Sequence, residues 1–373
     1  MIYFDNAATT YVDKEILDSF VTAIEKVSGN SSSLHKEGTK ALVMEQKARK
    51  QIASFFNAEE NDVLFTSGAT ESNNLAIRGV AFKYQNRGRH IITTKIEHLS
   101  VLETLKQLEE LFNFEVTYLD VDENGVISIE DLKNNIRDDT ILVSVMSVNN
   151  EVGSIQPIEE IGRLLKQYPK IYFHVDATQS IGKININYDD VDLLSLSGHK
   201  IHSFKSFGIL LKRKHVSLLP MNTGGGHQNG YRSGTTNVPA EIAIAKAIRF
   251  AFENQKRWYE HALILRKHLV DGLSKIEGIS LNSNDKCSQF IISFAVNKKA
   301  SVVQQALSDR DIYVSTKSAC SSKKEFVSYV LEEMKKDKWV CGNSLRVSFS
   351  HKNTIEEIDV FIKELKDVLK NIK

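Results

Sequence analysis

The feature that most constrains the fold is an alternation of two patterns through the first two thirds of the chain. Short apolar runs rich in β-branched residues are followed by stretches whose apolar residues recur at helical spacing. This alternation predicts a mostly parallel sheet with helices on both faces. We expect strands at 63–66, 90–93, 115–119, 141–146, 171–175, 192–197 and 208–212, and helices at 36–56, 98–112 and 158–167.

The last third of the chain has a different pattern. A long stretch after Pro239 with apolar residues on one helical face predicts a connecting helix. A further apolar run at 290–295 precedes a terminal helix, which opens with the capping box Thr354…Glu357. We therefore predict a large α/β domain at 14–250 and a smaller α+β domain made of 1–13 and 251–373.

Composition excludes several classes of function. The formal net charge is +1, with acids and bases interspersed, so no basic surface for direct nucleic-acid binding is expected. No apolar run approaches the roughly 20 residues that span a membrane, and the first residues do not resemble a signal peptide. Three scattered cysteines are too few for a disulfide framework or a closed zinc site. We expect a cytoplasmic protein without a bound metal.

Three segments with chemical character follow predicted strands. The first, Thr66 to Ser72, reads TSGATES and precedes a helical pattern at 73–84. A strand, a small-residue turn and a helix N-terminus make a phosphate cradle, because free backbone N–H groups converge there. The segment lacks the Gly-Lys-Ser/Thr ending of a P-loop. By itself it is equally compatible with a capped helix start that binds nothing.

The other two segments place an acid and a lysine at strand ends. Asp176 follows one apolar run and Lys200 another, at the edge where α/β sheets bind their ligands. Pyridoxal phosphate needs this pair: a lysine to hold it covalently, and a carboxylate to keep its ring nitrogen protonated. Lys200 alone would be read as a solvated loop residue. Cradle, acid and lysine together favour a pyridoxal phosphate enzyme of fold type I.

Short motifs along nearly the whole chain resemble those of one family. The sequence is similar to the cysteine desulfurases of the NifS/IscS group, within the class-V aminotransferases, which have the fold-type-I architecture. The motifs are YFDNAATT at 3–10, the cradle segment, EH at 97–98, NNEVG at 149–153, HVDATQ at 174–179, SLSGHK at 195–200, GGGH at 224–227, RSGT at 232–235, SAC at 318–320 and SLR at 344–346.

The resemblance assigns roles to individual residues. Lys200 would bind the cofactor and move the Cα proton, and His98 would stack on the cofactor ring, although without the resemblance a helix-start histidine would be preferred. Arg346 would bind the substrate carboxylate as a bidentate pair, with help from Asn6; an ordinary strand arginine is the alternative. The implied cofactor-binding set is Ala69, Thr70, His98, Asn150, Asp176, Gln179, Ser197, His199, Lys200 and Thr235, the last reaching across from the second subunit of a homodimer.

Cys320 determines the implied reaction. It lies in a polar stretch with three lysines, an environment that favours the nucleophilic thiolate. The resemblance implies that L-cysteine is converted to L-alanine, with its sulfur moved to a Cys320 persulfide. An acceptor protein for iron–sulfur cluster assembly or tRNA thiolation would then take the sulfur. The alternatives are a selenocysteine lyase, another class-V aminotransferase, or a catalytically poor scaffold that docks sulfur-transfer partners.

Two stretches depart from the family pattern. Where the family has Gly-Pro-Lys-Gly, this chain has Ser203-Phe204-Lys205-Ser206, so a different backbone near the cofactor is expected. Lys317 stands where glycine is usual, two residues before Ala-Cys, which bears on rate or acceptor choice. Neither departure removes a catalytic group.

Overall fold

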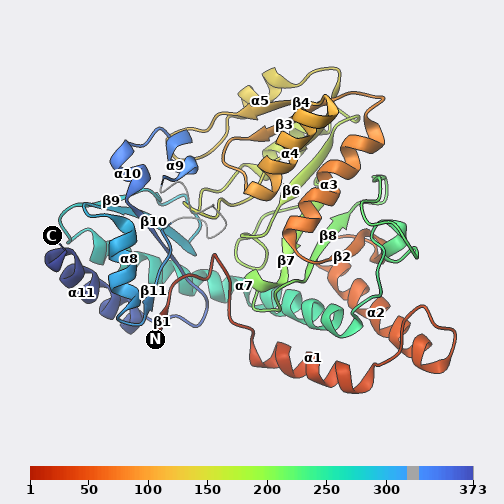
Figure 1. Ribbon diagram of the computed structural model, residues 1–373, viewed down its shortest axis with the longest axis horizontal. Coiled ribbons are helices and arrows are strands. Elements are labelled where there is room, and N and C mark those ends of the chain that lie inside the picture. Colours follow the sequence, from red (N-terminus) through yellow and green to blue (C-terminus); the bar gives the residue numbers. More distant parts are fainter. Residues whose placement is uncertain (317–326, 373) are drawn as a thin grey trace.

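The computed structural model describes residues 1–316 and 327–372. Its centre is a seven-stranded sheet in the order β2-β8-β7-β6-β5-β3-β4 (Figure 1). Strand β8 is antiparallel to both of its neighbours, and the other neighbouring pairs are parallel. The strands are β2 (Val63–Thr66), β3 (His90–Thr94), β4 (Glu115–Leu119), β5 (Thr140–Ser144), β6 (Tyr172–Asp176), β7 (Leu193–Ser197) and β8 (Gly208–Lys212).

Hydrophobic clusters cover both faces of this sheet. Successive strand residues point to opposite faces, so Leu64 and Leu142 join one cluster while Phe65 and Val143 join the other. Helices α3 (Ala69–Tyr84) and α4 (Leu99–Phe112) pack on the first face, and α2 (Lys36–Ser54), α6 (Ile158–Leu165) and α7 (Val238–Leu273) contribute to the second. Two further helices are α1 (Lys14–Lys26) and α5 (Ile129–Asn135).

A second, smaller sheet lies beside the long helix α7. It is three-stranded and antiparallel, in the order β12-β10-β9, and it packs on α7, α8 and α11 through its own hydrophobic cluster. The short strand β1 pairs with β11, which brings the first residues of the chain against this sheet (Figure 1). The elements are β1 (Ile2–Tyr3), β9 (Ile279–Leu281), β10 (Ile291–Val296), α8 (Ala300–Ser308), β11 (Ile312–Tyr313), α9 (Tyr329–Glu333), α10 (Lys338–Gly342), β12 (Ser344–Ser348) and α11 (Ile355–Asn371).

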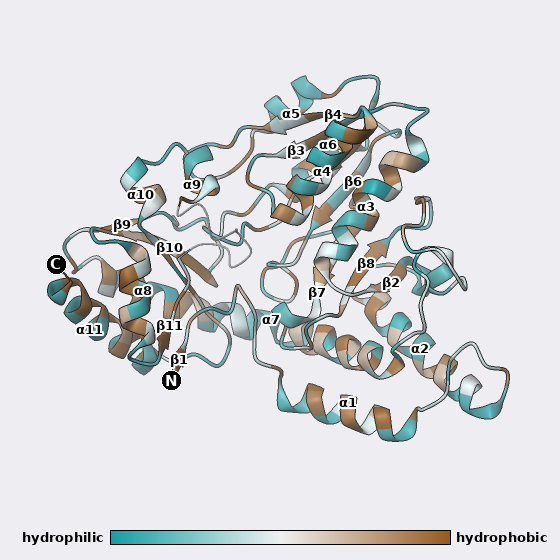
Figure 2. Ribbon diagram, viewed as in Figure 1, coloured by the Kyte–Doolittle hydropathy of each residue, from teal (hydrophilic) through white to brown (hydrophobic). Residues whose placement is uncertain are grey.

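The expected fold class is confirmed: a mostly parallel α/β sheet is accompanied by a smaller α+β unit. Colouring by hydropathy shows why the sequence pattern was informative, because strands in the interior are largely brown and surface helices carry teal outer faces (Figure 2). The capping box of Thr354 and Glu357 is present at the start of α11. The helix predicted to begin at residue 73 begins at Ala69 instead, so the cradle segment is itself the first turn of α3.

Helix α7 is continuous from Val238 to Leu273 and passes through the predicted domain boundary at 250/251. The exact division of the chain therefore stays a prediction. Among the described helices, none is both long enough and apolar enough to cross a membrane.

Candidate active site

A cavity of about 500 Å³ lies where the carboxyl ends of the parallel strands meet the N-terminal segment and the smaller sheet. Ten of the residues predicted to bind cofactor or substrate line it: Ala69, Thr70, His98, Asn150, Asp176, Gln179, Ser197, His199, Lys200 and Arg346. They come from segments up to 277 positions apart (69 to 346), and the fold brings them around one space.

One end of the cavity is formed by the cradle segment, the turn that leads into α3. Gly68 immediately precedes α3 and has φ of +146°, a conformation that side-chain-bearing residues rarely adopt. The helix then begins at Ala69, and its N-terminal end lies at the cavity. The backbone N–H groups of a first helical turn have no partner within the helix. Ser67 N–H donates to Glu71 Oε2 at 2.6 Å, and the Glu71 carboxylate forms an ion pair with Arg232 at 2.9 Å. These contacts fix the loop that shapes the cradle.

Asp176 ends β6 and is held as a hydrogen-bond acceptor. Asn73 on α3 donates to Asp176 Oδ2 at 2.8 Å, and Thr178 N–H donates to Oδ1 at 3.0 Å. Asn73 is fully buried and also donates to Ser100 Oγ at 2.9 Å. The two donors fix the Asp176 carboxylate in position at the cavity wall.

Lys200 lies at the end of a short 3-10 turn, Gly198–Lys200, directly after β7. Its ammonium donates to the carbonyl oxygens of Ala7 at 2.6 Å and Ala8 at 2.8 Å, so the N-terminal segment positions the amine. The neighbouring His199 is half-buried. Its burial and the charge of Lys200 lower its pKa to about 4, which makes His199 a neutral hydrogen-bonding group near neutral pH.

Two side chains on the cavity wall have their orientation set by the backbone. His98 is the N-cap of α4 and accepts from Ser100 N–H at 3.1 Å through Nδ1. Asn150 follows β5, and its Oδ1 is buried without a hydrogen bond inside the described part of the chain. A buried acceptor left in this way is expected to meet a donor on a bound molecule.

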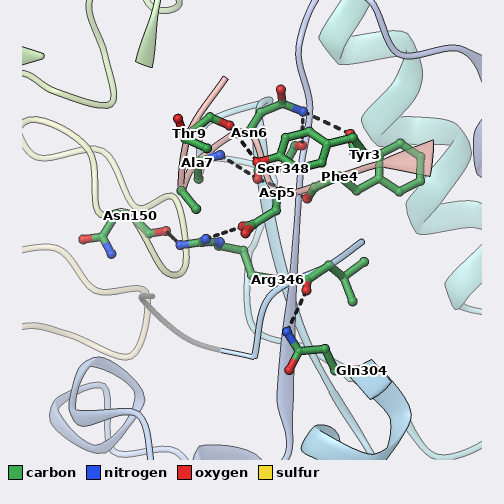
Figure 3. Close-up of polar contacts among 12 residues, drawn as sticks. Tyr3, Phe4, Asp5, Asn6, Ala7, Thr9, Asn150, Gln304, Arg346 and Ser348 are labelled. Carbon is green, nitrogen blue, oxygen red and sulfur yellow. Dashed lines mark hydrogen bonds and ion pairs between the residues drawn. The ribbon is translucent and has the colours of Figure 1, made fainter. Parts of the chain in front are cut away.

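Arg346 on β12 closes the cavity from the side of the smaller sheet (Figure 3). Nη1 donates to the carbonyl oxygen of Asn150 and Nη2 to Asp5 Oδ1, both at 2.7 Å. Its Nε is buried and makes no hydrogen bond with the residues described. The side chain is only 3% exposed, so its charge acts at short range and with little screening by water.

Three predicted residues are not among those lining the cavity. Asn6 is buried beside it, where its amide donates to Ser348 O at 2.9 Å and anchors the N-terminal segment (Figure 3). Thr235 lines a neighbouring pocket of about 170 Å³, which shares Ser67 and Ser206 with the cavity. Cys320, like Lys317, lies outside the described residues. The roles assigned to these residues stay predictions.

Sequence reasoning missed several residues at the site. Asn73 and Thr178 hold Asp176, Lys205 lines the cavity, and Lys183 lies buried behind Gln179. Asn73 could have been noticed, because it falls on the apolar stripe of α3 with Ala76, Ile77 and Val80. The other three lie in turns, where no periodicity distinguishes an inward side chain from a solvated one.

The departure at Ser203–Ser206 has a local structural outcome. Ser206 has φ of +56°, so the turn keeps a left-handed residue where the family pattern has glycine. A serine in this conformation is strained by roughly 1 kcal/mol relative to glycine. Ser206 and Lys205 both line the cavity, and this turn therefore belongs to the site.

One cluster outside the cavity also has metal-ligand chemistry: Asp13, His202 and His351. Asp13 already forms an ion pair with Lys352, and His202 Nδ1 lies 3.1 Å from the carbonyl oxygen of Tyr11, to which it must donate. Burial lowers the pKa of His202 to about 4. We interpret the cluster as packing between the N-terminal segment, the Lys200 turn and the smaller sheet.

The comparisons with known proteins agree with this geometry. Residues 2–361 match the family model for aminotransferase class-V, and the chain belongs to that family. Within it, the chain is 41% identical to a NifS/IcsS protein homolog of Lactobacillus delbrueckii subsp. bulgaricus, over 97% of this chain and 95% of that protein. It is also 41% identical to cysteine desulfurase IscS of Vibrio vulnificus, over 100% of this chain and 93% of that protein.

Solved structures of similar proteins support the same family assignment. A NifS-like protein superposes with a TM-score of 0.94 at 38% identity, with both chains covered completely. A structure described as SspA in complex with cysteine superposes with a TM-score of 0.82 at 34% identity, covering 95% of this chain and 100% of that one. The chain is thus a member of the NifS/IscS group, whose enzymes depend on pyridoxal phosphate.

Proposed function

We propose that this protein is a pyridoxal phosphate-dependent cysteine desulfurase that moves the sulfur of L-cysteine to Cys320 as a persulfide and releases L-alanine. The observation that carries the proposal is the convergence of Asp176, Lys200 and Arg346 on one cavity. Full-length similarity to proteins named cysteine desulfurase, and to a protein whose structure holds cysteine, supports the same reaction.

The residues present fit the cofactor. The cradle before α3 offers N–H groups to a phosphate, Asp176 is a hydrogen-bonded acceptor for a ring nitrogen, and Asn150 Oδ1 is a buried acceptor without a partner among the described residues. The cofactor would be held by Ala69, Thr70, His98, Asn150, Asp176, Gln179, Ser197, His199 and Lys200. When bound, pyridoxal phosphate supplies an electron sink for the electron pair released at the substrate Cα.

The substrate carboxylate would be held by Arg346. Its guanidinium is oriented by Asn150 O and Asp5 Oδ1, which leaves the buried Nε–H without a partner among the described residues. A planar guanidinium with a free edge binds a carboxylate through two parallel hydrogen bonds. Binding there would direct the amino group and the Cα–H of cysteine toward Lys200.

Lys200 would move the proton at the substrate Cα. Its Nζ is a strong hydrogen-bond donor in the protonated state, and the Ala7 and Ala8 carbonyls hold it at the cavity wall. After it has lost a proton, the same amine would act as the base toward the substrate, and general base catalysis of this kind contributes about 10²- to 10⁴-fold to rate. Sulfur transfer follows: the Cys320 thiolate bonds to the substrate sulfur, and the Cβ–S bond breaks as its electron pair returns toward carbon.

We propose a homodimer in which Thr235 contributes to the cavity of the second subunit. Thr235 is exposed and lies in a pocket next to the cavity of its own chain, so it does not reach its own cofactor site directly. The neighbouring surface also carries unusual apolar exposure: the Leu34 side chain is fully exposed, and Leu17, Val21 and Ile24 are exposed along α1. Exposed apolar side chains grouped in this way are typical of subunit interfaces.

The sulfur acceptor would be a protein that serves iron–sulfur cluster assembly or tRNA thiolation. We place this chemistry in the cytoplasm, because persulfide transfer requires reduced thiols. The two cysteines in the described residues, Cys287 and Cys341, are both unpaired.

The test is the release of alanine and sulfide from L-cysteine in the presence of a reductant. Wild-type protein is expected to form alanine continuously, and Cys320→Ser and Lys200→Ala to lose at least about a hundredfold of that rate. Cys341→Ser and Lys214→Ala are the matched controls, since neither residue lines the cavity: Cys341 is buried outside it and Lys214 is exposed. Full activity of Cys320→Ser on cysteine would exclude the persulfide route.

A further inference from the structure

Lys183 is a buried lysine that the reaction described above does not use. It lies in the turn that follows β6, and it is only 8% exposed. In the described part of the chain, Lys183 forms no ion pair with a carboxylate. Lysine is almost never buried unless it is paired. A position of this kind requires a reason beyond packing.

The Lys183 amine connects to the cofactor cavity through one side chain. Its Nζ donates to Gln179 Oε1 at 3.3 Å. The other end of that amide, Gln179 Nε2, donates to the carbonyl oxygen of Ala7 at 2.9 Å, and Lys200 Nζ donates to the same oxygen at 2.6 Å. Because Oε1 receives the amine, the –NH₂ end of Gln179 must face Ala7 and the cavity wall.

The charge of Lys183 is coupled to that of Lys200. Burial, together with the positive charges of Lys200 and Arg346, lowers the pKa of Lys183 to about 7. His199 and His202 also face this amine, and burial keeps both neutral, with pKa values of about 4. Lys183 is therefore a neighbour of Lys200 that titrates near neutral pH.

We propose that Lys183 is a positioning residue for the reaction: it fixes the amide orientation of Gln179 and, through its positive charge, weakens proton binding at the nitrogen of Lys200. The first effect directs a hydrogen-bond donor toward the bound cofactor. The second favours the deprotonated nitrogen that can act as a base. A like charge nearby disfavours the protonated form of an amine, and the low-dielectric surroundings strengthen that effect. The inference rests on the proposed function, since it concerns the lysine that holds the cofactor.

The experiment is a spectrophotometric pH titration of the holoenzyme without substrate, which follows the visible band of the Lys200-linked cofactor. Lys183→Met is expected to raise the midpoint of the titration by at least about half a pH unit, because a neighbouring positive charge is lost. Lys170→Met removes an exposed lysine after α6 and is the matched control, with its midpoint expected to be that of the wild type. Lys183→Arg keeps a charged donor at every pH of the titration and is expected to hold the midpoint at or below that of the wild type.

A midpoint in Lys183→Met equal to that of the wild type, with the cofactor bound, would overturn the proposal, because a merely structural lysine leaves the titration unchanged. Where Lys183→Met does not retain the cofactor, Lys183→Gln is titrated in its place. It keeps a donor for Gln179 and removes the charge, so the same upward shift is expected. A wild-type protein that binds no pyridoxal phosphate would instead contradict the proposed function, and this outcome is seen before any variant is compared.

Discussion

Replacing Asn73 tests how much the activity depends on the hydrogen bonds that hold the Asp176 carboxylate. Its amide donates to Asp176 Oδ2 at 2.8 Å from a fully buried position, and no sequence motif pointed to it. Replacing it by alanine removes one hydrogen bond to a charged group, worth about 1.5–3 kcal/mol. The Asp176 carboxylate then loses one of its two donors and is held less firmly as the proposed partner of the cofactor ring nitrogen.

If this loss appears in full in the transition state, Asn73→Ala lowers kcat by roughly 10- to 150-fold. The assay is alanine formation from L-cysteine at saturating substrate, with cofactor content and thermal midpoint measured on the same preparations. Asn74→Ala is the matched control: Asn74 is the next residue of α3, and its side chain donates to Thr70 O within the helix. A kcat for Asn73→Ala within twofold of the wild type, at full cofactor content, would refute the reasoning.

Two further predictions concern stability. Burial raises the pKa of Glu241 to about 8, above the value of 4.5 that is ordinary for a glutamate. Wild-type stability is therefore fully present below pH 4.5 and is lost as the pH rises to 8. The advantage of Glu241→Gln over the wild type in urea unfolding is expected to grow from less than about 1 kcal/mol at pH 5 to a few kcal/mol above pH 8; parallel pH profiles would contradict this. Gly182→Ala is expected to lower the free energy of unfolding by roughly 2–4 kcal/mol, because φ is +68° and the new Cβ would lie 2.2 Å from Ala251 Cβ. Gly342→Ala is the control: its new Cβ meets nothing within 4 Å, and the variant is expected to unfold with the wild-type midpoint.

The parts of the fold that the sequence predicted are those set by local periodicity. Strands β2, β4 and β8 have the predicted bounds. For β2 and β8, a buried run of four or five residues between polar turns leaves little freedom in where the strand begins and ends. Strands β5 and β6 are shifted by one or two residues, since their apolar runs continue into the loops. Asp176 and Lys200 were found because each follows such a strand, and chain direction alone places them at the same sheet edge.

The contacts behind the cavity could not be predicted, for a physical reason. Whether Lys183 or Asn73 points inward depends on the tertiary packing of a turn and a helix against a sheet, and a single sequence does not encode those distances. Local propensity favours solvent for both residues. The family resemblance also did not predict the contact between Arg346 and Asp5. These residues are 341 positions apart, and they meet only because β12 lies beside the N-terminal segment.

The first residues of the chain connect the groups of the site to one another. Ala7 O accepts from Gln179 and from Lys200, and Asp5 Oδ1 accepts from Arg346. Two residues of one segment therefore contact both Lys200 and Arg346. Asn6, between them, is anchored to Ser348 O. Backbone carbonyls carry most of these contacts, and side-chain substitutions leave backbone acceptors in place. The relative position of Lys200 and Arg346 is therefore set mainly by the path of this segment, so a change that displaces it should alter base and substrate placement together.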